Sequence, residues 1–247
     1  MLRTLGVVQA GGSHHRRLAR RIGGTPVLEW VLRRLTEAQQ LDHVVVLTGQ
    51  GAEDESILGL VPPDVTTYRS GRPDLLGRLD ALLHRIPAQG AVLVPSDTPF
   101  VDPALIDRLV AEATEHPQCD YICYAGADGR PLNPQTVGLF GQWVRAEVLV
   151  QLHRRLTAQA DRRHPIRYLL AHSGVYSLRL LALPRPVRAQ ELRLRMQWAE
   201  DWEHLQAIYE ALGPDQLDWA RIVQLLEDQP QMRRQMAQLN QKQAAEA

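Results

Sequence analysis

The sequence predicts an α/β protein of three layers, a mostly parallel sheet with helices on both faces. Short β-branched runs alternate with amphipathic helical stretches through the first half of the chain. These runs are apolar along their whole length, which is typical of strands buried on both faces of a parallel sheet. The chain has 247 residues, of which 45% are hydrophobic, so it can bury a large core.

The expected elements follow one another along the chain. Buried strands are expected at residues 5–10, 43–48, 65–68, 91–95 and 119–124. Helices with one apolar stripe are expected at residues 26–39, 74–85, 103–115 and 199–212. Residues 137–150 combine a strand with a helix, and residues 176–183 and 192–196 resemble further strands. Ligands bind beyond the carboxyl ends of parallel strands, so a site is expected after Ala10, Thr48 or Pro95.

The chain is predicted to form one α/β domain, residues 1–216, followed by a helical tail, residues 217–247. No Gly/Ser linker or internal repeat divides the first part, and the tail is rich in glutamine. Met232, Met236 and Leu239 form a thin apolar stripe on the tail. This stripe packs on the body of the protein or on another subunit, and the body is favoured because any helix needs one apolar face.

Charge and composition disfavour several classes of protein. The 28 basic residues equal the 28 acidic ones, whereas a protein that tracks nucleic acid usually has a basic excess. No run of 18 apolar residues predicts a membrane span. Cys119 and Cys123 would share one face of a strand, and two reduced, packed thiols are favoured over a metal or redox pair. We therefore expect a cytoplasmic protein without a nucleic-acid or membrane partner.

The first candidate site is the turn after the first strand, residues 9–13, followed by a basic segment. Glycines there would let the backbone approach a phosphate, and arginines supply permanent charge with a forked donor geometry. The turn contains neither the dinucleotide fingerprint nor a P-loop. A glycine turn beside a solvated basic loop explains the pattern equally well. His14 and His15 are candidate ligands, although adjacent histidines in a polar loop are mostly exposed.

The second candidate site follows the strand at residues 91–95. Asp97 stands at the end of a buried parallel strand, where a carboxylate can hold Mg²⁺ against a nucleotide phosphate. Asp102 precedes Pro103, the pattern of a helix N-cap with proline in the first turn. Asp97 is therefore the functional candidate and Asp102 the structural one.

Several short motifs occur together in the order found in one known family. They are V-V-Q-A at residues 7–10, G-G-T-P-V-L-E at 23–29, S-G-R-P-D-L-L-G-R at 70–78, S-D-T-P-F-V-D-P at 96–103, E-D-W-E at 200–203, A-I-Y-E-A-L at 207–212 and L-N-Q-K at 239–242. In their order and spacing the chain resembles the cytidylyltransferase-like proteins of spore coat polysaccharide biosynthesis. These are relatives of the enzymes that activate Kdo and acylneuraminic acids as CMP-sugars. The likeness covers nearly the whole chain.

The resemblance implies the GT-A fold of nucleotide-diphospho-sugar transferases. In that family a sugar hydroxyl attacks the α-phosphate of a nucleoside triphosphate, and Mg²⁺ neutralises charge as pyrophosphate leaves. Asp97 would bind the Mg²⁺ ion. By position, the nucleotide would contact Gln9, Ala10, Gly11, Gly12, Ser13, Ser70, Gly71, Arg78 and Ser96.

The chain departs from the family at two charged positions. The family loop R-L-P-G-K is shorter here and has no lysine, so Arg17, Arg20 or Arg21 would supply the catalytic charge. Gln197 stands where the family has its second metal-binding aspartate, and its amide offers an oxygen but no charge.

These residues lead to two hypotheses of function. The first is transfer of CMP from CTP to an acidic sugar, with release of pyrophosphate, in surface polysaccharide biosynthesis. The second is a degenerate member that binds a nucleotide or a partner without turnover, motivated by Gln197 and the missing lysine. A glycosyltransferase is disfavoured because residues 96–98 lack the first aspartate of an Asp-x-Asp pair. The resemblance also allows a homodimer through residues 137–171.

Overall fold

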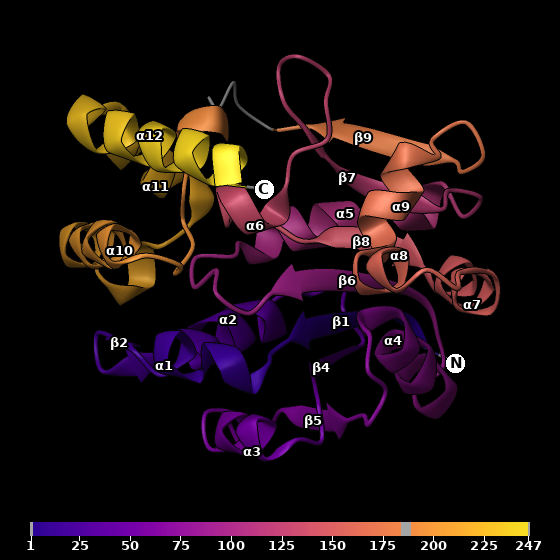
Figure 1. Ribbon diagram of the computed structural model, residues 1–247. Coiled ribbons are helices and arrows are strands. Elements are labelled where there is room, and N and C mark those ends of the chain that lie inside the picture. The colour runs from indigo at the N-terminus through magenta and orange to yellow at the C-terminus, as the bar shows by residue number, and fades with distance from the viewer. Residues whose placement is uncertain (1, 184–188, 247) are drawn as a thin grey trace.

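A seven-stranded sheet forms the centre of the molecule (Figure 1). The computed structural model describes residues 2–183 and 189–246. In spatial order the strands are β5 (Thr66–Arg69), β4 (His43–Thr48), β1 (Leu2–Gln9), β6 (Ala88–Pro95), β8 (Gln142–Arg145), β7 (Tyr121–Ala125) and β9 (Leu178–Ala182). Neighbouring strands are parallel except at β8, which runs antiparallel to both β6 and β7. The mostly parallel α/β sheet predicted from the sequence is confirmed.

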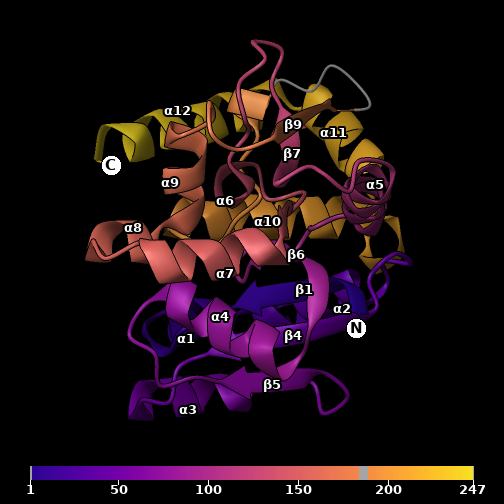
Figure 2. The same cartoon turned by 90° about the vertical axis from the view of Figure 1, so that its right-hand side faces the viewer.

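Helices cover both faces of this sheet, which confirms the three-layer arrangement. One face packs against α2 (Val27–Thr36), α5 (Pro103–Glu115), α10 (Ala199–Leu212) and α11 (Trp219–Glu227). The other face packs against α4 (Leu75–Arg85), α7 (Ala146–Arg155) and α9 (Pro165–Ala171), which face the viewer in Figure 2. The two buried clusters are separated by the sheet, whose side chains alternate between them.

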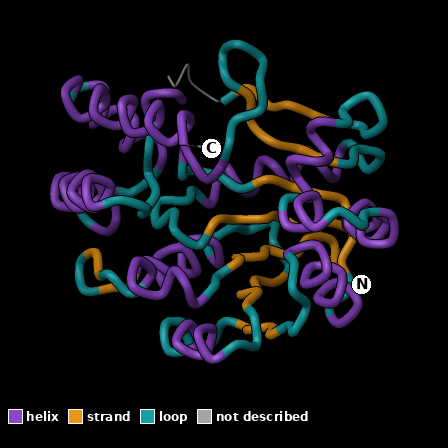
Figure 3. The backbone as a smooth tube through the Cα atoms, in the orientation of Figure 1, coloured by secondary structure: helices purple, strands orange, loops and turns teal. Residues whose placement is uncertain are grey.

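Short elements connect the layers, as the tube in Figure 3 shows. The helices among them are α1 (His15–Leu18), α3 (Ala52–Leu58), α6 (Pro134–Val137) and α8 (Gln159–Arg163). A small hairpin consists of β2 (Arg21–Ile22) and β3 (Thr25–Pro26). Single 3₁₀ turns are η1 (Gly12–His14), η2 (Ala189–Glu191) and η3 (Pro214–Gln216), and α12 (Pro230–Glu246) ends the chain's described part.

Asp102 has the structural role that the sequence predicts. Its carboxylate accepts hydrogen bonds from the backbone N–H groups of Ala104 and Leu105 at 3.0 and 3.2 Å, which satisfies the first turn of α5. Its other oxygen accepts from the N–H of Trp219 at 2.8 Å and lies 3.7 Å from the guanidinium of buried Arg34. One side chain thus starts α5 and ties it to α11 and α2.

Two expectations about local structure are wrong. Residues 192–196 form no strand, because their backbone bonds to separate segments: Leu194 N–H donates to Val137 O, and Met196 N–H donates to Asp97 O. Strand β7 begins only at Tyr121, so Cys119 lies before it and packs in the opposite cluster from Cys123. Both thiols are free and buried, as expected.

The tail packs on the body of the protein. Met236 of α12 is fully buried in the core cluster that includes α10 and α11, and Met232 packs against it. This confirms the favoured location of the apolar stripe, and the division at residue 216 stays a prediction. Among the described helices, none has the length and apolar character needed to cross a bilayer.

Candidate active site

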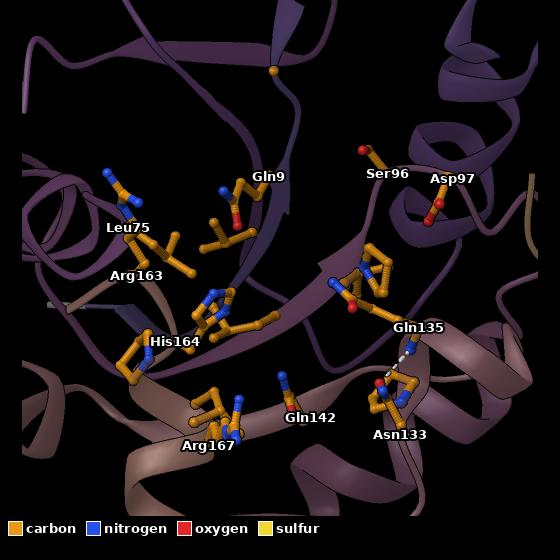
Figure 4. Close-up of a pocket in the computed structure, with 18 of the residues that line it drawn as sticks. Gln9, Leu75, Ser96, Asp97, Asn133, Gln135, Gln142, Arg163, His164 and Arg167 are labelled. Carbon is orange, nitrogen blue, oxygen red and sulfur yellow. Dashed lines mark hydrogen bonds between the residues drawn. The ribbon is translucent and has the colours of Figure 1, made fainter. Parts of the chain in front are cut away.

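A cavity of about 810 Å³ opens at the carboxyl ends of β1 and β6 (Figure 4). Val7 and Gln9 reach it from β1, and residues 93–97 reach it from β6 and the turn that follows. Segments from η1, α3, α4, α6, α8 and α9 complete the walls. The site therefore lies where parallel strands end, as the sequence predicts.

Positive charge dominates the lining of this cavity. The charged and imidazole side chains that line it are Arg17, Arg78, Arg163, Arg167, Arg195, His14, His164, Glu53, Asp54 and Asp97. A cleft in which arginines outnumber carboxylates concentrates anions. Its volume is within the range of small-molecule and cofactor sites. The arrangement suits a polyanionic ligand such as a nucleoside triphosphate.

The turn after β1 presents a neutral histidine to the cavity. His14 is the last residue of the 3₁₀ turn Gly12–His14, in which His14 N–H donates to Gly11 O. Arg17 Nη2 lies 2.6 Å from His14 Nδ1, and since a guanidinium can only donate, Nδ1 is the acceptor. Burial, and then the charge of Arg17, lower the pKa of His14 below 6.5.

The structure separates the three arginines expected to supply the catalytic charge. Arg17 lines the cavity. Arg20 instead stacks on the ring of Trp202, 4.1 Å from its centroid, and Arg21 donates to Gly24 O at 2.7 Å in the β2–β3 hairpin. Arg17 is therefore the arginine of this group that is placed to meet a ligand.

The residues expected to bind nucleotide also divide. Those that line the cavity are Gln9, Gly11, Ser13, Arg78 and Ser96. Ala10 is buried, and its N–H donates to Leu47 O in the sheet. Ser70 is buried and bonds within its own turn, while Gly71 lies against Gln50. Gly12 is the first residue of the 3₁₀ turn and lies in the sequence between Gly11 and Ser13, which both line the cavity.

Asp97 forms an ion pair that the sequence did not indicate. Arg195 Nη2 donates to Asp97 Oδ2 at 2.8 Å, and the two side chains are only 9% and 12% exposed. The backbone holds the same pair together, because Met196 N–H donates to Asp97 O at 2.7 Å. Arg195 lines the cavity beside Asp97. Its segment, L-R-L-R at residues 192–195, lies within the range where the sequence predicts a further strand, residues 192–196.

Gln197 is bound to a second buried arginine. Arg193 is fully buried, and its Nη2 donates to Gln197 Oε1 at 3.2 Å. The same guanidinium pairs with Asp201 and reaches α12, where Nη1 donates to Gln243 Oε1 at 2.6 Å. Gln197 does not line the cavity.

The residues at Asp97 do not fit a resident Mg²⁺ ion. One oxygen of Asp97 accepts from Arg195, and the amide oxygen of Gln197 accepts from Arg193. Within the described ranges, the one group of three or more candidate metal ligands is Glu112, Glu115 and His116 on α5, none of which lines the cavity. The metal site expected at Asp97 and Gln197 is therefore not assembled by these side chains.

Arg163, His164 and Arg167 form a group of basic side chains on the other side of the cavity from Ser96 and Asp97 (Figure 4). Polar side chains lie between this group and Asp97. Gln142 accepts a hydrogen bond from the hydroxyl of Tyr121 through its amide oxygen at 2.7 Å, so its NH₂ group is left to face the cavity. Sequence reasoning found none of these residues, because they come from the irregular second half of the chain.

Comparisons with known proteins agree with this fold. The chain is 22% identical over 223 residues to the spore coat polysaccharide biosynthesis protein SpsF of Bacillus subtilis (strain 168), covering 87% of this chain and 88% of that protein. A cytidylyltransferase from Leptospira borgpetersenii serovar Hardjo-bovis (strain JB197) has a similar structure, with a TM-score of 0.83 and 17% identity over 94% of this chain and 97% of its own.

Two further solved structures, each containing a bound ligand, have a similar fold. CMP:2-keto-3-deoxy-manno-octonic acid synthetase complexed with CTP has a TM-score of 0.63 and 12% identity, covering 85% of this chain and 99% of its own. Rv0371C of Mycobacterium tuberculosis H37Rv, complexed with manganese, has a TM-score of 0.57 and 24% identity, covering 83% of this chain and 98% of its own.

The match to a family model decides the classification. Residues 6–175 match the model described as the MobA-like NTP transferase domain. This segment includes the loop after β1, Asp97 and the cluster at Arg163, His164 and Arg167. It spans more than half of the chain and includes the carboxyl ends of β1 and β6, where the cavity opens. The chain therefore belongs to the MobA-like NTP transferase family and is a nucleotidyltransferase.

Proposed function

We propose that the protein transfers CMP from CTP to an acidic sugar and releases pyrophosphate, in surface polysaccharide biosynthesis. The observation that supports this proposal is the pair of cationic clusters on opposite sides of one cavity. Arg195 pairs with Asp97 and Arg17 bonds to His14 in the loop after β1, whereas Arg163 and Arg167 lie across the cavity from Asp97 (Figure 4). One cluster suits a triphosphate and the other suits the carboxylate of the acceptor.

The two substrates would meet between these clusters. The triphosphate lies along the turn of residues 11–13, where backbone N–H groups and Arg17 hold its oxygens. The acceptor carboxylate pairs with Arg167, and its hydroxyls bond to Gln142. The arrangement brings one sugar hydroxyl to the α-phosphate. The contribution of the protein is positioning and electrostatic stabilisation, without a covalent intermediate.

Mg²⁺, the cofactor that the resemblance predicts, enters this proposal with the substrate. Bound to the phosphates of CTP, Mg²⁺ would neutralise part of their negative charge. No protein side chain is assigned to a resident ion.

A pyrophosphate-release assay tests the proposal. Purified protein is incubated with CTP, UTP, GTP or ATP and with sugars that differ only in having or lacking a carboxylate. The expected result is release with CTP and a carboxylated sugar, and its loss in Asp97→Asn. Equal turnover by Asp97→Asn would show that the site is assigned wrongly. Binding of CTP by calorimetry without turnover across the sugar panel would favour the second hypothesis, a degenerate binding member.

The proposal also includes a cytoplasmic location and a homodimer. The buried free thiols Cys119 and Cys123 suit the reducing cytoplasm. A homodimer through residues 137–171 stays a prediction, and light scattering of the purified chain measures it.

A further inference from the structure

Arg195 lies beside Asp97, where the resemblance to the cytidylyltransferase-like family predicts the positive charge of a Mg²⁺ ion. Its guanidinium is 2.8 Å from the Asp97 carboxylate and lines the cavity. The side chain is nine-tenths buried, so the charge is poorly screened by water. Among the described residues its buried Nε–H has no hydrogen-bond partner. The Nε–H groups of Arg69, Arg145 and Arg233 are buried and unpartnered too, so it is the position of the Arg195 guanidinium beside Asp97, at the cavity wall, that points to an anionic ligand.

The surroundings hold Arg195 in this place. Met196 N–H is bonded to Asp97 O, and Arg195 Nη1 lies 3.5 Å from Gln243 Oε1 of α12. The neighbouring Arg193 anchors the segment through Asp201. A guanidinium held on both sides cannot leave Asp97 without disturbing the packing of α12.

We infer that Arg195 replaces a protein-bound metal ion as the charge that neutralises the nucleotide phosphates. A magnesium ion held by a second aspartate would bring a net charge of +1, two positive charges less one negative, beside Asp97. Arg195 alone brings the same net charge, because the uncharged Gln197 adds none. The part of its guanidinium that faces the cavity bonds to phosphate oxygens, while Asp97 orients the guanidinium. This inference rests on the proposed function, since it assigns the phosphate contacts of the proposed nucleotide.

The inference predicts that triphosphate binding does not require a divalent cation. Calorimetry would measure CTP and inorganic tripolyphosphate with Mg²⁺ and with EDTA, on the wild type, Arg195→Gln and Asp97→Asn. Arg221→Gln is the matched control, because it removes the same group from an exposed Asp–Arg pair on α11. Paramagnetic resonance with Mn²⁺ alone measures a resident metal site directly.

The expected result is binding of both probes in EDTA, with a loss of about tenfold or more in Arg195→Gln and no loss in the control. No saturable Mn²⁺ site is expected in the wild type. Retained binding in Arg195→Gln, or a saturable Mn²⁺ site that disappears in Asp97→Asn, would overturn the inference and leave the proposed function standing.

Failure of the proposed function gives a different result. If tripolyphosphate binds and loses affinity in Arg195→Gln, but CTP does not bind, the cytidylyltransferase proposal is wrong and the phosphate-binding role of Arg195 stands. Binding of neither probe under any condition would overturn both. Thermal melts of each variant show whether it is folded, and Arg195→Lys keeps the charge if Arg195→Gln fails to fold.

Discussion

Arg193 and Asp201 form a fully buried, two-pronged ion pair. Nε donates to Oδ1 at 2.5 Å and Nη2 to Oδ2 at 3.1 Å, and neither side chain is exposed. Asp201 also accepts from the N–H groups of Gln197 and Trp198 at the start of α10. The pair therefore joins the segment that contains Arg195 to α10, and Gln243 joins it to α12.

Removing one partner of this pair should destabilise the whole fold. Asp201→Ala leaves a buried guanidinium without its counter-charge, and a loss of about 3–5 kcal/mol in the free energy of unfolding is expected. Urea denaturation measures it. Arg221→Ala, which breaks the exposed pair with Asp218 and leaves the N-cap of α11 in place, is the comparison and should cost less than about 1 kcal/mol. Similar losses in the two variants would contradict this account of the buried pair.

Asp102 is expected to matter for stability and not for ligand binding. Asp102→Ala removes the N-cap of α5 and should lower the free energy of unfolding by about 2 kcal/mol from that loss alone. Asp102→Asn keeps a capping oxygen and should be milder. Calorimetry with CTP on both variants should give the wild-type affinity, because Asp102 does not line the cavity. A loss of affinity with intact stability would assign Asp102 to the site.

Gly138 is expected to tolerate no side chain. Its φ of +78° is unfavourable for other residues, and an added Cβ would overlap the carbonyl oxygen of Leu194. Gly138→Ala should therefore lower the free energy of unfolding by about 1–3 kcal/mol and weaken CTP binding, since Leu194 precedes Arg195. Gly129→Ala is the matched control, because φ is +71° there but the space is open. Equal effects of both variants would attribute the loss to backbone strain.

Phosphate binding should raise the pKa of His14. In the free protein burial and Arg17 hold this pKa below 6.5, so the imidazole is neutral at pH 7. Negative charge in the cavity favours the protonated form, so the bound state takes up a proton. Tripolyphosphate affinity is therefore expected to increase as the pH falls toward the pKa of the complex.

Imidazole resonances measured by NMR with and without tripolyphosphate test this shift. His14→Gln should remove the resonance and flatten the dependence of affinity on pH between about 5 and 8. An unchanged His14 pKa on binding would place the phosphates elsewhere.

The sequence predicted the fold well because periodicity is a local signal. Apolar runs such as His43–Thr48 and stripes such as Pro103–Glu115 are fixed by short segments, and the structure has a strand and a helix there. The segment at residues 192–196 shows the limit. Its alternation satisfies a strand pattern, yet both arginines are buried by partners 8 and 98 residues away. Ion pairs between residues so far apart in the chain produce no periodic pattern in the sequence.

The candidate site could be predicted only in part, because some of its residues follow predictable strands and others do not. Strand ends located Gln9, Ser96 and Asp97, which do line the cavity. Arg163 and Arg167 belong to short helices whose sequence resembles any basic, solvent-exposed stretch. Only the packing of α8 beside α4, and of α9 beside α8, brings them to the cavity wall.

The reversed strand β8 has a consequence for the order of assembly. It lies between β6 and β7, although it follows both in the sequence. A nascent chain that ends before residue 142 can pair β5, β4, β1 and β6, but the outer edge of β6 then has no neighbour. Strands β7 and β9 join the sheet only through β8. The first half can therefore form an open-edged intermediate on the ribosome, and β7, although made earlier, can join it only once β8 has been made.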